Sequence, residues 1–82
     1  MHNENLVKMA NDISHFFQSD PDPVTAVQGM LDHLHRFWEP RMRIAIIAHY
    51  YSQGGEGLTD LAKEAVKKLA AESVSLAGVG DG

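Results

Sequence analysis

The chain has 82 residues, no cysteine, and a net charge of −4 with neutral histidines. This length fits one small domain with a single core, and the lack of cysteine excludes disulfides, thiol nucleophiles and thiolate metal sites. The acidic balance disfavours nucleic acid and anionic lipid, because phosphate groups attract basic surfaces. With no signal-peptide pattern and no run of about 18 apolar residues, the sequence predicts a cytoplasmic protein that does not span a membrane.

Two amphipathic helices are predicted in the first half of the chain. At 100° per residue, the apolar side chains of the first segment fall within about 120°; they are Leu6, Met9, Ala10, Ile13, Phe16 and Phe17. Prolines in residues 19–23 end this helix, and Asp22 and Pro23 are typical of the N-cap and first residue of the next. The apolar arc of the second helix is about 140° wide; it contains Val24, Val27, Met30, Leu31, Leu34, Phe37 and Trp38.

Two further helices follow. Pro40 interrupts the second pattern, and we favour a short corner there over a kink. The third helix is predicted from about Pro40 to Ser52, where a glycine-rich segment can form its C-cap. The fourth carries apolar residues from Leu58 to Leu69 on one face. The predicted fold is therefore all-α, a compact bundle of four short helices over residues 1–73, followed by a frayed, flexible tail over residues 74–82.

The third helix is too apolar to face a single core. Its large apolar side chains spread over roughly 200°, whereas a core-facing stripe needs about 100°; they are Met42, Ile44, Ile46, Ile47, Tyr50 and Tyr51. Part of this arc is predicted to remain exposed as a binding face. Arg43 lies inside the arc, and two interpretations stay open. Its stem covers apolar surface while the guanidinium reaches water, or it pairs with a carboxylate of a partner.

No residue pattern predicts chemistry within the chain. His33 and His35 project about 160° apart on one helix and cannot share a metal ion. The glycine-rich loop lacks the third glycine and the preceding strand of a phosphate-binding motif. The third helix has too few exposed polar residues to read DNA bases. We therefore expect no catalytic residue, no metal site and no cofactor in this chain.

The stretch Phe37-Trp38-Glu39-Pro40-Arg41-Met42-Arg43 is the most specific part of the sequence. Together with residues 6–13, Phe16-Phe17, His33-Leu34, Ile47, His49, Gly57-Leu58 and the alanine-rich last helix, it resembles the delta subunit of NAD-dependent, molybdenum-containing formate dehydrogenases. The resemblance implies a cofactor-free, non-catalytic accessory subunit of a cytoplasmic complex. The larger subunits would carry the molybdenum centre, iron–sulfur clusters, flavin and NAD site. The implied role is assembly or stability of the complex, or molybdenum-cofactor insertion into the catalytic subunit.

The motif and the excess apolar surface coincide at the corner between the second and third helices. We predict that this corner binds the larger formate dehydrogenase subunits, above all the molybdenum-binding catalytic subunit, through Trp38, Pro40, Arg41, Arg43, Ile46 and Tyr50. In the alternative reading of this corner, Phe37 and Trp38 close the bundle core and Pro40 only makes the turn; for Phe37 this is the favoured reading. The alternative function is a self-associating regulatory or adaptor protein, a homo-oligomer in which the third helix pairs with its own copy.

Overall fold

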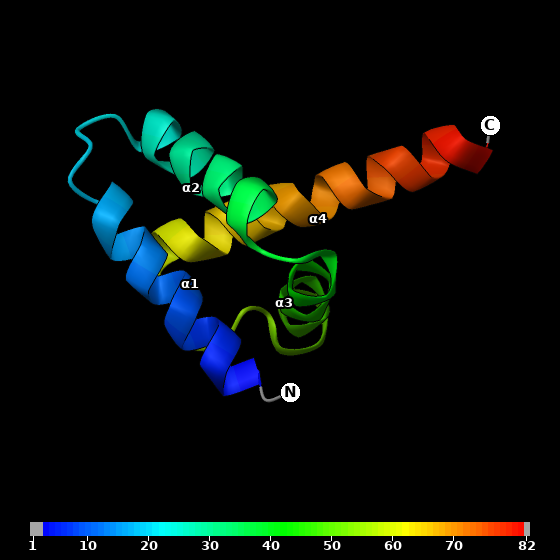
Figure 1. The fold of residues 1–82 in the computed structure, drawn as a ribbon, viewed down its shortest axis with the longest axis horizontal. Coiled ribbons are helices and arrows are strands. Elements are labelled where there is room, and N and C mark those ends of the chain that lie inside the picture. Colours follow the sequence, from blue (N-terminus) through cyan, green and yellow to red (C-terminus); the bar gives the residue numbers. More distant parts are fainter. Residues whose placement is uncertain (1–2, 82) are drawn as a thin grey trace.

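Four α-helices make up the part of the chain that the computed structural model describes, residues 3–81, with side chains described for residues 3–73 (Figure 1). They are α1 (Asn3–Phe17), α2 (Pro23–Phe37), α3 (Pro40–Gln53) and α4 (Asp60–Asp81). Residues 3–81 contain no strand. The predicted all-α class and number of helices are confirmed. The corner at Pro40 is confirmed as well, because α2 ends at Phe37 and Pro40 begins α3.

Local sequence signals set the helix ends. The carboxylate of Asp22 caps α2, accepting hydrogen bonds from the Val24 backbone N–H at 3.1 Å and the Thr25 hydroxyl at 2.8 Å. The hydrogen bond from Thr25, and then that from Val24, hold the pKa of Asp22 below its ordinary value of 3.8. At the end of α3, Gly54 adopts the left-handed conformation with φ 67°, which a residue with a Cβ atom rarely adopts.

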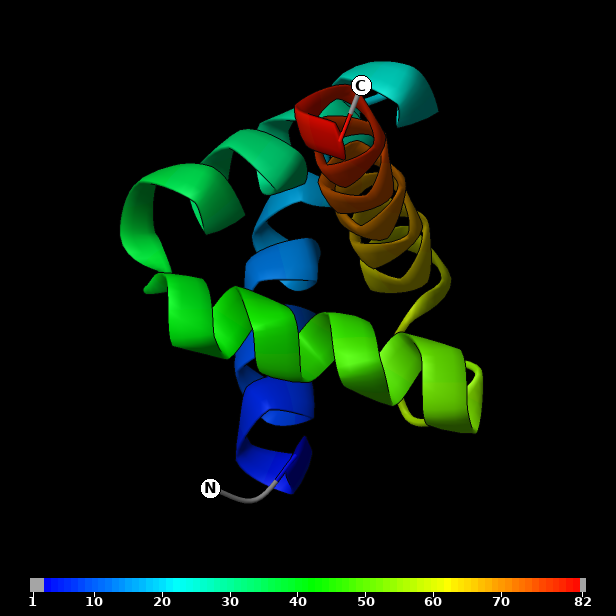
Figure 2. The same cartoon turned by 90° about the vertical axis from the view of Figure 1, so that its right-hand side faces the viewer.

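The last helix is the centre of the packing. α4 contacts α1, α2 and α3, while α3 also runs across α1 (Figure 2). Small residues of α4, Ala62 and Ala65, are fully buried and let the other helices approach closely. The largest fully buried apolar side chains come from all four helices; they are Leu6, Met30, Leu34, Ile46 and Val66. Removal of such surface from water supplies the main driving force for folding.

A part-buried polar cluster joins α1 to the loop before α4. The Asn11 side chain donates to the carbonyl of Gly57 and accepts from the backbone N–H of Thr59, both at 2.9 Å. The Thr59 hydroxyl donates to the Ser14 hydroxyl at 2.8 Å and accepts from the backbone N–H of Ala62 at 3.1 Å. Thr59 thus satisfies a free N–H group of the first turn of α4 while α1 is held against the same turn.

Some residues of the predicted apolar arcs lie outside the core. Phe16 is 74% exposed, Val24 73% and Phe37 69%. The favoured reading of Phe37 as a core residue is therefore wrong. Trp38, only 5% exposed, closes the core instead. It is the C-cap of α2 with an extended backbone, φ −88° and ψ 136°, so helical angles no longer describe where its side chain lies.

The end of α4 extends away from the other helices (Figure 1). The backbone of residues 74–81 continues this helix, and Gly82 lies outside the described residues. The predicted division into a folded part, 1–73, and a flexible tail, 74–82, stays a prediction.

Candidate partner-binding site

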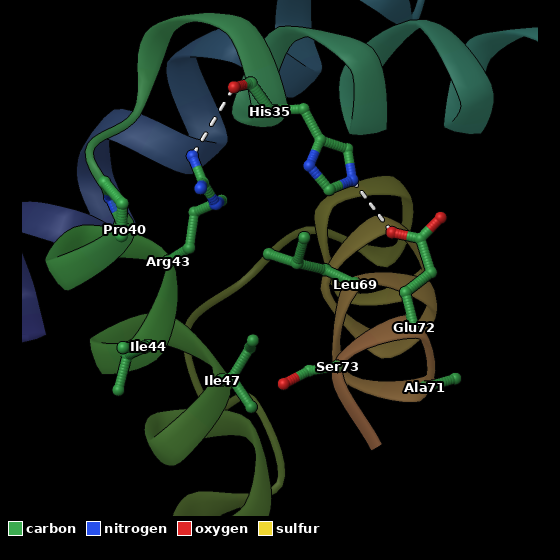
Figure 3. A pocket seen from close by; sticks show the side chains of 9 residues that line it. All are labelled: His35, Pro40, Arg43, Ile44, Ile47, Leu69, Ala71, Glu72 and Ser73. Carbon is green, nitrogen blue, oxygen red and sulfur yellow. Dashed lines mark hydrogen bonds and ion pairs between the residues drawn. The ribbon is translucent and has the colours of Figure 1, made fainter. Parts of the chain in front are cut away.

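An open groove of about 820 Å³ lies between the end of α2, the first half of α3 and the middle of α4 (Figure 3). Apolar side chains form much of its surface; they are Pro40, Ile44, Ile47 and Leu69. Three larger polar residues stand at its α2 end, namely His35, Arg43 and Glu72. A concave apolar surface with a few polar groups at one end is the usual chemistry of a binding site.

Part of α3 beside this groove is uncovered. Ile44 is 66% exposed and Tyr51 is 62% exposed. They are seven residues apart and therefore share one face of the helix, with the exposed Ala48 between them. The prediction that the apolar arc of α3 exceeds what the small core can cover is confirmed for these residues.

Arg43 finds hydrogen-bond acceptors within the chain. Its Nη1 donates to the carbonyl of Trp38 and lies 3.4 Å from the carbonyls of Leu34 and His35. These carbonyls belong to the end of α2, where the helix dipole favours a positive charge. The Leu34 carbonyl also accepts a hydrogen bond from the Trp38 backbone N–H at 3.1 Å. Neither of the two sequence interpretations of Arg43 describes this arrangement, because its acceptors are backbone carbonyls of the chain itself.

His35 and Glu72 make a side-chain contact beside the groove, which is an ion pair only when His35 is protonated. The His35 Nε2 and the Glu72 Oε1 are 2.8 Å apart and connect α2 to α4 (Figure 3). Their side chains are 46% and 48% exposed, so water screens the pair and its net contribution to stability is at most about 1 kcal/mol. Residues 37 positions apart share no sequence pattern, and for this reason Glu72 was not among the predicted site residues.

The residues predicted to bind a partner do not form one surface in the structure. Pro40 and Arg43 line the groove, and Arg41 is exposed in the first turn of α3. Tyr50 is half-buried and packs against the core. Trp38 and Ile46 are buried in the core and present almost no surface to a partner in this structure. Ile44, Ile47 and Leu69, which do line the groove, were absent from the predicted site.

Other features of the described residues bear on chemistry. Within residues 3–73 no group of three or more histidine or acidic side chains is placed to hold a metal ion. His33 packs against the Phe37 ring while His35 faces Glu72, so the two imidazoles diverge. His49 is buried, and its Nε2 donates to the carbonyl of Glu56 at 2.8 Å. In the same part of the chain, no helix has the length and apolarity to cross a membrane.

The fold and the groove define a small helical protein with an exposed apolar surface. Residues 5–66 match the family model of the NADH-dependent formate dehydrogenase delta subunit FdsD, and the chain belongs to this family. The resemblance seen in the sequence is thereby confirmed. A delta subunit associates with other formate dehydrogenase subunits. The match ends within α4, so Leu69 and Glu72 of the groove lie beyond it. No curated protein and no solved structure matches the chain significantly.

Proposed function

We propose that this chain is a non-catalytic accessory subunit of a cytoplasmic, NAD-dependent, molybdenum-containing formate dehydrogenase. It binds the molybdenum-carrying catalytic subunit through the groove and the outer face of α3, and it supports assembly, stability or insertion of the molybdenum cofactor. The observation that carries this proposal is the exposed apolar stripe of Ile44 and Tyr51. The chain that carries this stripe belongs to a family of formate dehydrogenase subunits.

Burial of this stripe against a partner is favourable in free energy. Each Å² of apolar surface removed from water contributes about 25 cal/mol, and large apolar or aromatic side chains supply most of the binding energy in protein interfaces. The neighbouring Pro40 is rigid and already ordered, so its contact costs little conformational entropy. Of the predicted contact residues, Tyr50 completes the proposed surface, whereas Arg41 is exposed at the start of α3 and does not line the groove. Trp38 and Ile46 act from inside by holding α2 and α3 in position.

An exposed position tests docking without disturbing the core. Ile44→Asp should reduce recovery of the catalytic subunit with the tagged chain at least tenfold, because the new carboxylate must lose its water in the interface. Val24→Asp is the matched control, since Val24 is 73% exposed and does not line the groove. The free energy of unfolding of each variant should differ from that of the unchanged chain by no more than about 0.5 kcal/mol. Equal recovery of the catalytic subunit with both variants would contradict docking through the groove.

The role after docking needs a second measurement. Molybdenum content and thermal inactivation are compared for the enzyme produced with and without this chain. Low molybdenum without the chain supports cofactor insertion, and normal molybdenum with faster inactivation supports stabilisation. Unchanged molybdenum content, yield and inactivation would contradict all three proposed roles.

Self-association is the second candidate, favoured by the same stripe. Ile44 and Tyr51 lie one heptad apart on α3, and two copies of such a face can pair about a two-fold axis. Sedimentation of the purified chain distinguishes the candidates. A tight homodimer that Ile44→Asp dissociates supports this candidate, whereas a monomer supports the accessory subunit.

A further inference from the structure

A second apolar surface lies on α1 and α2, away from the groove. Four rings form a continuous row, which we call the aromatic row: Phe16, Phe17, His33 and Phe37. Neighbouring ring centroids are 5.0 Å apart between Phe16 and Phe17, 6.3 Å between Phe17 and His33, and 4.6 Å between His33 and Phe37. Both ends of the row are exposed, since Phe16 and Phe37 keep 74% and 69% of their surface in water.

The aromatic row and the groove are separate surfaces. His33 and Phe37 border a hollow of about 370 Å³ that also includes Met9 and Met42, and none of its lining residues lines the groove. His33 and His35 show the separation on one helix. Two residues apart, they project to opposite sides of α2, one into the row and the other toward Glu72. One flat partner surface therefore cannot cover both at once.

Phe17, in the middle of the row, is held in place before any partner arrives. Phe17 packs directly on Gly29 of α2, where an added Cβ atom would lie 2.7 Å from the Phe17 Cε1. That distance is too short for a real contact, so glycine is what allows the ring to lie against the helix. Rings already ordered by such packing lose little further entropy on binding.

The charges beside Phe37 indicate what covers it. Arg36 precedes Phe37 and Arg41 follows the corner; both are exposed, and in residues 3–73 neither forms an ion pair. The exposed Glu39 lies between them, and Asp12, which lines the same hollow as Phe37, is 4.0 Å from Lys8. Three basic against two acidic side chains leave this corner net positive on a chain of net charge −4. Arginine and large aromatic side chains in combination are typical of the residues that contribute most to protein interfaces. The complementary surface has an apolar pocket for the Phe37 ring and carboxylates beside that pocket.

We propose that the aromatic row is a second docking surface, which binds a polypeptide segment with an apolar pocket flanked by acidic residues. The chain then bridges two polypeptide surfaces of its complex, one on the groove and the other on the row. This inference rests on the proposed function only for the identity of the complex. The exposure of the row and its arginines is independent of the groove.

Photo-crosslinking in the assembled, purified formate dehydrogenase tests the bridge. The full-length chain carries p-benzoylphenylalanine at one position at a time, as Phe37→p-benzoylphenylalanine or Ile44→p-benzoylphenylalanine. The expected result is two crosslinked peptides from different segments of the larger subunits, with aspartate or glutamate near the site linked to residue 37. Val24→p-benzoylphenylalanine, equally exposed but outside both surfaces, should give at least tenfold less product.

Other crosslinking results would overturn the inference. The inference fails if position 37 gives no crosslinked product, or if its product is with a second copy of this chain. It also fails if the product is nuclease-sensitive and contains nucleic acid, or if positions 37 and 44 crosslink to the same peptide. A product from position 44 without one from position 37 removes the second surface and leaves the proposed function intact. A product from position 37 alone removes docking through the groove, and with it the bridge.

Charge reversal tests the chemistry of the partner. In the chain with Phe37→p-benzoylphenylalanine, the added pair Arg36→Glu and Arg41→Glu should lower the product yield at least tenfold. The pair Lys67→Glu and Lys68→Glu, on exposed positions of α4, makes the same change in net charge and should leave the yield unchanged. Equal loss with both pairs, or no loss with either, would contradict an acidic partner surface.

Discussion

The guanidinium of Arg43 donates to the carbonyl of Trp38, so that a side chain of α3 completes the end of α2. Arg43→Met should lower the free energy of unfolding by about 1.5–3 kcal/mol, the usual contribution of a hydrogen bond to a charged group. Arg43→Glu should cost more, because a carboxylate is repelled by the carbonyls and by the negative end of the helix dipole. Urea unfolding of the isolated chain measures both.

Arg41 provides the control for Arg43. It lies two residues away in the same helix and is exposed, so Arg41→Glu should change the free energy of unfolding by no more than about 0.5 kcal/mol. Equal stabilities for Arg41→Glu and Arg43→Glu would show that the carbonyl contacts contribute nothing. The expected loss also means that Arg43→Glu is unsuitable as a pure docking variant, and this is why Ile44 is preferred.

Asn11 should contribute strongly to the stability of the fold. Asn11→Ala removes its two hydrogen bonds, to Gly57 and from Thr59, and should lower the free energy of unfolding by about 1–3 kcal/mol. Asn11→Asp keeps the acceptor for Thr59 but places a carboxylate oxygen against the Gly57 carbonyl, so it should rescue little. Thermal unfolding followed by circular dichroism measures the loss. Gln28→Ala, which removes an exposed side-chain amide, should have little effect.

Gly54 and Gly55 should respond differently to the same substitution. Both have positive φ, 67° and 75°, and Gly54→Ala should cost about 1–2 kcal/mol from backbone strain alone because nothing lies within 4 Å of its added Cβ. Gly55→Ala should cost at least about 1 kcal/mol more, because its Cβ would lie 3.3 Å from both Lys63 Cγ and Tyr50 Cδ1. Denaturant unfolding of both variants gives the difference. Equal losses would mean that the surrounding side chains move aside freely.

Asp22 should make the stability of α2 depend on pH. Its pKa is lower in the folded chain than in the unfolded one, so its contribution is complete above the ordinary value of 3.8 and is lost as the pH falls through the lower folded pKa. Asp22→Asn keeps a side-chain oxygen to cap the helix but cannot titrate. Its stability should vary less with pH between about 5 and 2 than that of the unchanged chain. Parallel slopes in acid unfolding curves would contradict this contribution.

Much of the fold was predictable because its signals are local. The apolar arcs, Asp22 with Pro23, Pro40 at the corner and the glycines after α3 each act within one turn of chain. The groove was less predictable, because it depends on how α2, α3 and α4 are placed relative to one another. The acceptors of Arg43 are backbone carbonyls, which every residue carries and no pattern distinguishes. Helical angles also placed Phe37 and Trp38 on one face, although the helix ends between them.

The order of the helices along the chain has a consequence for biosynthesis. α4, against which all three other helices pack, is translated after them. Until Asp60 and the residues after it leave the ribosome, the buried faces of α1, α2 and α3 can pack only against one another. Premature termination in the loop before α4 would therefore release a fragment with open apolar faces, which cellular quality control would treat as misfolded.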